Sequence, residues 1–267
     1  MPERLQKILS QWGVASRRQA EQLILDGRVQ LNGSVAQLGQ KANPEIDHIE
    51  VDGQPLQPAN RPELVTLLLH KPLAVLSTCH DPWQRPTVLE LLPQPYQEVG
   101  LHPVGRLDSD TTGALLLTND GRLTFCLTHP QHHVPKTYHA WVQGHPAETV
   151  LQQWREGIIL SGRPTLPAEV RVLERRLGNQ PQTHLEIVLR EGRNRQIRRV
   201  AERLGCPVVH LHRTAIGPIQ LQPSGEPKLP QGSYRPLRLT ELEFLRNLIG
   251  IIFGDSNSRV IRKECQV

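Results

Sequence analysis

Cysteine, aromatic residues and long hydrophobic runs are scarce in this sequence. Its 4 cysteines lie far apart, without a CxxC pair, which excludes a disulfide scaffold and disfavours a zinc ribbon. The longest apolar run near either end covers only residues 248–253, whereas a bilayer span needs about 20 residues. The start, Met1-Pro2-Glu3-Arg4, lacks the apolar stretch of a secretory signal. We therefore expect a soluble cytoplasmic protein that does not bind membranes.

What remains is the composition of a folded, basic protein. Hydrophobic residues make up 37% and charged residues 21% of the chain, which is enough apolar material for a buried core. Its 267 residues correspond to one large domain or two smaller ones. The formal net charge of +5 allows a polyanionic partner but does not demonstrate one.

The positive charge is concentrated in two segments. Residues 1–41 hold six basic residues against three acidic ones, and residues 190–213 hold seven arginines against two glutamates. Two separated basic segments favour two contact zones on one long anion such as nucleic acid. Two solvated helix faces are the alternative. Arginine in the second segment favours phosphate or base contact, because a guanidinium binds bidentately and stacks on bases.

The first sixty residues have the pattern of a compact module. Ser16 followed by Gln19 forms a capping box, which predicts the start of a helix. Asn32-Gly33 predicts a hairpin between two short strands. The polar stretch at 54–62 contains three prolines and is typical of a linker.

Strand and helix signals alternate after the linker, which predicts a mixed α/β domain at residues 64–247 and a tail at 248–267. Apolar or alternating stretches predict strands, and a 3.6-residue period predicts helices. The expected strands lie at 64–69, 115–118, 136–144, 170–173 and 185–189, and the expected helices at 147–159 and 194–204.

The segment from Pro103 to Gly113 holds the strongest candidate for a reactive side chain. Asp108 follows a predicted strand in a loop rich in small polar residues and bounded by Gly105 and Gly113. Loops held by a rigid scaffold are where catalytic groups usually lie. Taken alone, an aspartate in a turn is more often a helix cap or an Asx-turn.

A second candidate is the arginine cluster that begins at Arg190. On the expected helix, Arg195, Arg199 and Arg203 recur every four residues and share one face. Arg198 is offset from Arg195 by about 60° around the helix axis. A positioned arginine keeps a neighbouring aspartate ionised by lowering its pKa. The alternative is a helix face that contacts phosphates only.

Cys126, His129, His132 and His133 form a third cluster, with mixed ligand types at short spacing. A structural zinc site usually draws four ligands from two elements and uses more cysteine. We therefore expect no bound metal. Contact with RNA, or positioning of a neighbouring side chain, is the preferred role of these histidines.

The N-terminal segment from Arg4 to Gly53 resembles the S4 RNA-binding domain. The pattern that carries the resemblance is RLQKILSQWGVASRRQAEQLILDGRVQLNG, followed later by DHIEVDG. In that family a basic helical face docks on structured RNA. The resemblance implies RNA contacts for four side chains, Arg4, Lys7, Arg17 and Arg18. A small helical domain with incidental charge is the alternative.

The remainder, from Leu64 to Leu245, resembles the RsuA/RluB family of pseudouridine synthases, which modify ribosomal RNA. The segments that carry the resemblance are HKPLAVLSTCHDP, RPTVLELLP, PVGRLDSDTTGALLLTNDG, HPQHHVPKTYHAWVQG and REGRNRQIRRVAERLGCPVVHLHRTAIGP. An S4 module is the usual N-terminal partner of this domain. The resemblance implies an α+β fold, with a small S4 domain at 1–60 and a mixed α/β catalytic domain whose sheet is largely antiparallel.

The resemblance also implies the chemistry. Pseudouridine formation detaches uracil from C1′, turns the base and rejoins it through C5, so nothing is oxidised and no cofactor is expected. The aspartate of the family's GRLD motif is Asp108 here, and a single carboxylate nucleophile suffices. Attack on the sugar, attack on the base and stabilisation of a glycal route all remain open for this carboxylate. Asp110 is interpreted as loop structure.

The same resemblance assigns roles to further residues. Tyr138 stacks on the target base, and Arg198 pairs with Asp108 and keeps it ionised. Leu189 provides an apolar floor beneath the uracil. Arg106 occupies the space that the extruded nucleotide leaves, because a stacked base must be taken out of the stack before it reacts. The implied contacts to the RNA backbone are two further arginines, Arg193 and Arg195.

Together these expectations describe a metal-free rRNA pseudouridine synthase that acts as a monomer. The run Arg193-Asn194-Arg195-Gln196 is more similar to the members that act on 23S rRNA than to the one that acts on 16S rRNA. A non-catalytic S4-type ribosome assembly factor is one rival, disfavoured because Asp108, Tyr138 and Arg198 are all present. A hydrolytic N-glycosidase is the other, disfavoured because a second carboxylate at a suitable separation is missing.

Overall fold

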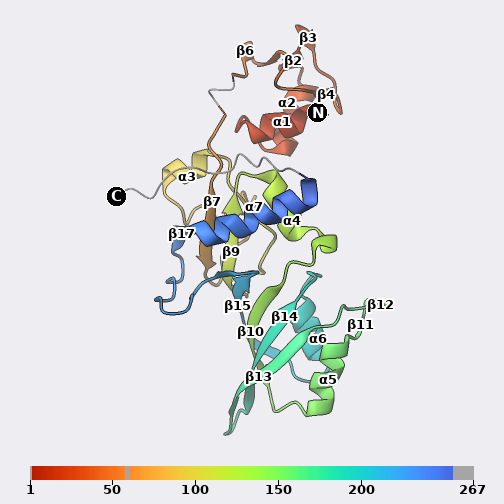
Figure 1. The fold of residues 1–267 in the computed structure, drawn as a ribbon, viewed down its shortest axis with the longest axis vertical. Coiled ribbons are helices and arrows are strands. Elements are labelled where there is room, and N and C mark those ends of the chain that lie inside the picture. The colour runs from red at the N-terminus through yellow and green to blue at the C-terminus, as the bar shows by residue number, and fades with distance from the viewer. Residues whose placement is uncertain (1, 58–60, 255–267) are drawn as a thin grey trace.

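The computed structural model describes residues 2–57 and 61–254, which form an elongated molecule with the N-terminal module at one end (Figure 1). The module has two helices, α1 (Leu5–Gln11) and α2 (Arg17–Leu25). Its strands are β1 (Glu3–Arg4), β2 (Val29–Leu31), β3 (Ser34–Val35), β4 (Lys41–Ala42), β5 (Ile49–Val51) and β6 (Gln54–Pro55). Four of them form a sheet in the order β3-β2-β5-β6, and β1 pairs with β4.

Local sequence explains how the module forms. The Ser16 hydroxyl accepts a hydrogen bond from the Gln19 amide at 3.3 Å, and the Gln19 side chain accepts one from the Ser16 amide at 3.1 Å. Asn32 and Gly33 have φ values of 52° and 78°, the left-handed conformations that a two-residue hairpin turn requires. The predicted capping box and the predicted hairpin are both confirmed.

The module has a hydrophobic core of its own. The buried members come from both helices and from the strands, and the partly buried ones extend the cluster no further than Leu56. The fully or nearly fully buried residues are Leu5, Ile8, Leu9, Ala20, Ile24, Val29, Leu31, Ala36, Ala42 and Ile49. No residue of the second domain belongs to this cluster, so burial within residues 5–56 is sufficient to account for the module's core.

A nine-stranded sheet organises the second domain. Its main order is β13-β14-β10-β15-β9-β7-β17, with β16 paired to β15 and β8 paired to β9. Every pair is antiparallel except β15 with β9, as the expected largely antiparallel sheet requires. The strands are β7 (Thr66–Lys71), β8 (His102–Pro103), β9 (Thr112–Thr118), β10 (Lys136–Gln143), β13 (Glu169–Arg176), β14 (Gln182–Leu189), β15 (Val208–Ile216), β16 (Ile219–Gln220) and β17 (Tyr234–Pro236).

Helices cover the two halves of this sheet separately. The remaining elements are α3 (Gln94–Glu98), α4 (Gly121–Thr128), the 3-10 turn η2 (Pro130–His132), α5 (Glu148–Glu156), the hairpin β11 (Ile159–Leu160) and β12 (Arg163–Pro164), α6 (Gln196–Arg203) and α7 (Leu239–Phe253). In Figure 1, α4 and α7 lie alongside the half that contains β7 and β9, whereas α5 and α6 lie alongside the half that contains β13 and β14. Each half buries its own apolar clusters.

The two halves meet where β15 runs beside β9. This parallel pairing covers only His212 with Thr112 and Arg213 with Gly113. Gly113 has φ 123°, and a Cβ atom there would lie 2.2 Å from the Arg213 carbonyl oxygen. Only glycine allows the two backbones to approach so closely. The junction brings the loop before β9, which carries Asp108, next to β15.

One helix boundary corrects the sequence prediction in a way that matters for the site. The helix expected at 194–204 is α6, and Arg195 precedes it in a left-handed conformation with φ 48°. Arg195 therefore does not share a helical face with Arg199 and Arg203, and the predicted stripe of three arginines is wrong.

The C-terminal helix also differs from the prediction. α7 continues to Phe253, so residues 248–253 belong to this helix and not to a tail, while the predicted tail from residue 255 onward lies outside the described residues. Among the helices of the described ranges, none is both long enough and apolar enough to span a membrane.

Candidate active site

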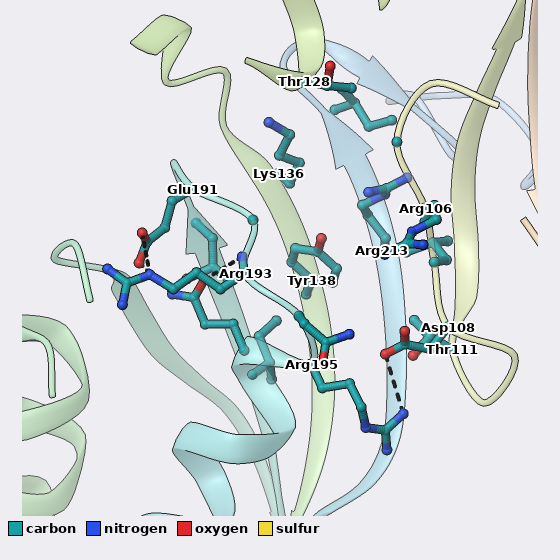
Figure 2. Close-up of a pocket in the computed structure, with 18 of the residues that line it drawn as sticks. Arg106, Asp108, Thr111, Thr128, Lys136, Tyr138, Glu191, Arg193, Arg195 and Arg213 are labelled. Carbon is teal, nitrogen blue, oxygen red and sulfur yellow. Dashed lines mark hydrogen bonds and ion pairs between the residues drawn. The ribbon is translucent and has the colours of Figure 1, made fainter. Parts of the chain in front are cut away.

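A cavity of about 320 Å³ opens between the two halves of the second domain (Figure 2). Its wall comes from the loop at 104–111, from the start of β10, from the segment at 189–198 and from β15. These segments are distant in sequence, and the β15–β9 junction brings them together. The cavity collects most of the side chains that the sequence singled out as reactive.

Hydrogen bonds on both sides of Asp108 hold its loop in place. The Ala74 amide donates to the Ser109 carbonyl at 2.9 Å. The Ser77 hydroxyl donates to the Leu107 carbonyl at 2.8 Å and accepts from the Leu107 amide at 3.1 Å. The Asp108 side chain remains 37% exposed and lies on the wall of the cavity (Figure 2).

A buried lysine anchors the same loop from beneath. Lys71 has no exposed surface, and its ammonium donates to the Pro72 and Thr111 carbonyls at 2.8 and 2.9 Å. Burial lowers the pKa of Lys71 from 10.5 to about 8, although the carboxylates of Asp110 and Asp108 act in the opposite direction. The sequence analysis did not single out Lys71, even though it belongs to the HKP segment that carries the family resemblance.

Arg195 is the arginine that reaches Asp108. Its Nη1 lies 3.4 Å from Asp108 Oδ2, and its Nη2 lies 3.0 Å from Asp110 Oδ2. Burial alone would raise the pKa of Asp110. The hydrogen bond from Arg195 and the charges of Arg198 and Arg195 outweigh burial and hold that pKa below its usual 3.8. The Arg195 guanidinium thus contacts the carboxylates of both Asp108 and Asp110.

Arg198 holds the backbone of the loop instead. Its Nη2 donates to the Asp110 carbonyl at 2.6 Å and to the Thr111 hydroxyl at 3.3 Å, and its Nε lies 3.3 Å from Asp110 Oδ2. The expected direct pairing of Arg198 with Asp108 is therefore wrong. The left-handed turn at Arg195 points that side chain toward the carboxylates, whereas Arg198 in the first turn of α6 faces the peptide groups after Asp108.

Tyr138 lies in the middle of the cavity wall, between Asp108 and Lys136 (Figure 2). Its ring packs against the core clusters of both halves, and the guanidinium of Arg213 lies 6.0 Å from its centroid.

Lys136 and Leu189 line the same cavity. Burial, followed by the charge of Arg213, lowers the pKa of Lys136 from 10.5 to about 8. Leu189 is 5% exposed and adds apolar surface to the cavity, and its role beneath the uracil stays a prediction.

Two family models match the chain. The family model described as RNA pseudouridylate synthase matches residues 65–203, and that of the S4 domain matches residues 3–45.

This chain belongs to the RNA pseudouridylate synthase family. It is 40% identical over 253 residues to an RNA pseudouridine synthase of Aquifex aeolicus, covering 94% of this chain and 96% of the relative. It is also 40% identical over 248 residues to the ribosomal large subunit pseudouridine synthase B of Bacillus subtilis, covering 92% and 96%. A crystal structure of a pseudouridylate synthase has 33% identity and a TM-score of 0.63, covering 91% of this chain and 99% of that one. The protein is thus an isomerase that forms pseudouridine from uridine in RNA.

The other candidate RNA contacts of the synthase lie at different places. Arg106 is exposed on the cavity rim (Figure 2). Arg193 points away from Asp108 (Figure 2), and its guanidinium donates to Glu191 Oε2 at 3.0 Å and to the carbonyls of Arg163 and Pro164. In the S4 domain, Lys7 forms an ion pair of 2.6 Å with Glu3. The other three S4 side chains predicted to contact RNA, Arg4, Arg17 and Arg18, are exposed.

The histidines beside the synthase cavity form a ring cluster. The rings of His129 and His132 lie 5.4 Å apart, and both contact Phe125. His132 Nδ1 lies 2.9 Å from the carbonyl oxygen of Cys126. Within the described residues, no group of three or more His, Cys, Asp or Glu side chains is arranged to hold a metal ion. His129 lines the cavity, and contact with RNA or positioning of a neighbouring side chain both stay predictions for it.

Two cavity residues were missed by the sequence analysis, Lys136 and Arg213. Arg213 is 5% exposed, and its Nε donates to the Ala114 carbonyl at 2.7 Å. Its Nη2 is buried without a hydrogen-bond partner among the described residues. Both residues belong to segments quoted for the family resemblance, KTY and HRTAIG. Lys136 lies two residues before Tyr138, a spacing that places both side chains on the same face of β10.

Proposed function

We propose that this synthase isomerises a specific uridine of the large-subunit (23S) ribosomal RNA, with Asp108 as its reactive carboxylate. The observation that carries the proposal is the position of Asp108 on a cavity that also presents Tyr138 and Arg195. The choice of RNA is supported by the Bacillus subtilis relative, whose name gives the ribosomal large subunit as its substrate. We also propose that the protein acts on RNA as a monomer in the cytoplasm.

The reaction balances without a redox partner. The bond between N1 and C1′ breaks, a bond between C5 and C1′ forms, C5 loses a proton and N1 regains one. Asp108 acts as the carboxylate that makes this exchange possible. Arg195 orients Asp108 by direct contact at 3.4 Å, and Arg198 fixes the backbone of the loop through the Asp110 carbonyl.

The remaining residues hold the base. Tyr138 offers its ring to the uracil, and Leu189 covers the base from an apolar side. Because the cavity lies inside the domain, the nucleotide must leave its stack to enter it. Arg106 on the rim is placed to fill the vacated position in the RNA. The cationic groups of Arg213 and Lys136 line the same cavity, where they suit the phosphates or carbonyl oxygens of the nucleotide.

Two rival functions receive less support. A hydrolytic N-glycosidase needs a second carboxylate that activates water, and the nearest one, Asp110, has both oxygens engaged by Arg195. A non-catalytic assembly factor does not require a carboxylate, a tyrosine and two arginines at one cavity. Action on 16S rRNA uses the same site and is distinguished only by the substrate.

A mapping experiment tests the function. Transcripts of 23S and 16S rRNA carrying 5-tritiated uridine are incubated with the protein, and tritium release is measured together with carbodiimide-blocked primer extension. We expect release and one new stop in 23S rRNA only. Free uracil would indicate the glycosidase, a stop in 16S rRNA would redirect the substrate, and RNA binding without release would indicate the assembly factor.

Asp108→Asn should abolish tritium release while RNA affinity stays within about twofold. The amide is nearly isosteric but cannot act as a nucleophile, and the loop is held by Lys71 and Arg198 rather than by the Asp108 side chain. Single-turnover assays and filter binding make the comparison. Activity within tenfold of the wild type would contradict the assignment of Asp108.

A further inference from the structure

The loop at residues 77–87 presents an exposed tryptophan outside the cavity. Trp83 is 74% exposed, whereas Trp154 is 2% exposed and Trp12 and Trp141 are half-buried. The guanidinium of Arg85 lies 5.0 Å from the centroid of the Trp83 ring. An indole with an adjacent guanidinium is therefore available at the surface.

A buried carboxylate fixes this arrangement. Asp81 is 7% exposed, and its Oδ2 accepts from the amides of Trp83 and Arg85, each at 3.1 Å. The Arg85 side chain adds bonds of 3.1 and 2.7 Å to the same carboxylate. Hydrogen bonding from Arg85 lowers the pKa of Asp81 to about 2. Asp81 thus fixes the backbone at Trp83 and the side chain of Arg85, which lies beside the indole.

The base of this loop is bonded to the loop of Asp108. Leu76 and Val88 close the base through backbone bonds of 2.9 and 3.0 Å, from the Leu76 amide to Pro86 and from the Val88 amide to Leu76. Ser77 bonds to Leu107, and Ala74 bonds to Ser109, the two neighbours of Asp108. The tryptophan loop and the Asp108 loop are therefore connected by hydrogen bonds at their bases.

We propose that Trp83, with Arg85, forms a stacking site for an unpaired nucleotide of the substrate RNA next to the target uridine. Unpaired bases are bound by aromatic rings and guanidinium planes, and Arg85 adds positive charge beside the ring. The inference rests on the proposed function for the substrate RNA and for its target uridine. It assigns Trp83 to RNA binding and register, with no part in the chemical step.

Three variants test the site: Trp83→Ala, Trp83→Phe and the control Leu177→Ala. Leu177 is 86% exposed at the tip of the β13–β14 hairpin and lies in neither loop. On the 23S rRNA transcript we expect Trp83→Ala to weaken binding by about tenfold, on the scale of one lost base stack. Trp83→Phe should recover most of the affinity, and Leu177→Ala should bind as the wild type does. The single-turnover rate at saturating enzyme should change by less than about twofold.

A double substitution then identifies the partner. Nucleotides flanking the mapped uridine are replaced one at a time by abasic residues in an rRNA fragment. At one position the abasic RNA should cost the wild type about tenfold in affinity and cost Trp83→Ala almost nothing, because the stack is already absent.

Equal losses for both proteins at every position, or wild-type affinity of Trp83→Ala, would overturn the stacking site. A wild type that releases no tritium from either transcript would instead refute the proposed function. The affinity comparison on the transcripts does not depend on turnover, so the two failures are distinguishable.

Discussion

Lys71 shows how a single buried charge supports the reactive loop. The ammonium is fully buried. It donates to the carbonyl of Pro72, which follows β7, and to that of Thr111, which precedes β9. A buried polar group is tolerated when its hydrogen bonds are made. The nearby carboxylates of Asp108 and Asp110 favour its charged form, so the lysine, the two aspartates and the two arginines form one electrostatic unit.

This arrangement predicts a pH dependence of stability. The pKa of Lys71 falls from 10.5 to about 8 on folding, so between pH 8 and 10.5 the unfolded chain binds more protons than the folded one. Stability from this group therefore rises with pH across that window, by up to roughly 3 kcal/mol. The free energy of unfolding of the wild type should increase relative to that of Lys71→Met by this amount, as measured by urea denaturation at several pH values.

The control for this measurement is Leu177→Ala, a substitution of an exposed residue that carries no titratable group. Its difference from the wild type should be constant with pH. A constant difference for Lys71→Met as well would mean that Lys71 titrates in the folded protein as it does in the unfolded chain.

At the scale of elements, the backbone at the start of α6 determines the different contacts of Arg195 and Arg198. Arg195 in its left-handed turn contacts the carboxylates, and the Arg198 side chain, 14% exposed, binds the Asp110 carbonyl. Arg198→Lys keeps the charge but loses the planar group that contacts two acceptors at once. The single-turnover rate should fall about tenfold, on the scale of a charged hydrogen bond, with RNA affinity changed less than about threefold.

Arg203→Ala is the matched control on the same helix, because Arg203 is exposed and lies away from the cavity lining. It should leave the chemical rate unchanged. If Arg198→Lys weakened RNA binding and left the rate intact, Arg198 would be a phosphate contact and Arg195 alone would orient the loop.

The sequence predicted what local chemistry determines. The Ser16 capping box, the Asn32-Gly33 turn and the alternation at 136–144 depend on neighbouring residues only, and the structure has all three. The stripe through Arg195 failed because its turn depends on Asp108 and Asp110, more than 80 residues earlier in the chain. Periodicity assumes that the helix continues through Arg195. It contains no information about the carboxylates of the loop before β9, which are distant in sequence.

The β9–β15 junction is another feature that periodicity could not reveal, and it yields a prediction. Gly113→Ala places a Cβ atom against the Arg213 backbone at 2.2–2.8 Å and in a backbone conformation that L-residues rarely adopt. The two strands must separate, which should lower the melting temperature by several degrees or more and reduce tritium release. Gly121→Ala, where nothing lies within 4 Å of an added Cβ, should remain close to the wild type in both measurements.

At the scale of the whole molecule, the chain divides labour between a module that binds and a domain that reacts. The S4 core is complete within residues 5–56, and the cavity is lined only by residues from 104 to 216. Positive charge follows the same division, with one basic segment in each part. Such a molecule can hold structured RNA at two places, so that the S4 domain increases the effective concentration of the target uridine at the cavity.

Deletion of residues 1–57 should therefore weaken rRNA binding and flatten its dependence on salt, because the exposed basic side chains of the S4 domain are lost. Each phosphate contact adds about one unit to the slope of log affinity against log salt, so the loss of Arg4, Arg17 and Arg18 should reduce the slope by about three.

The single-turnover rate of the same deletion variant at saturation should change much less, since the deletion removes no residue of the cavity. Salt-titrated filter binding and tritium release on the same preparations measure both quantities. The triple variant with alanine at these arginines is a check on the deletion, because the S4 core contains none of the three. A collapse of the saturating rate with unchanged affinity would show that the S4 domain shapes the reactive cavity, contrary to the separation of their cores.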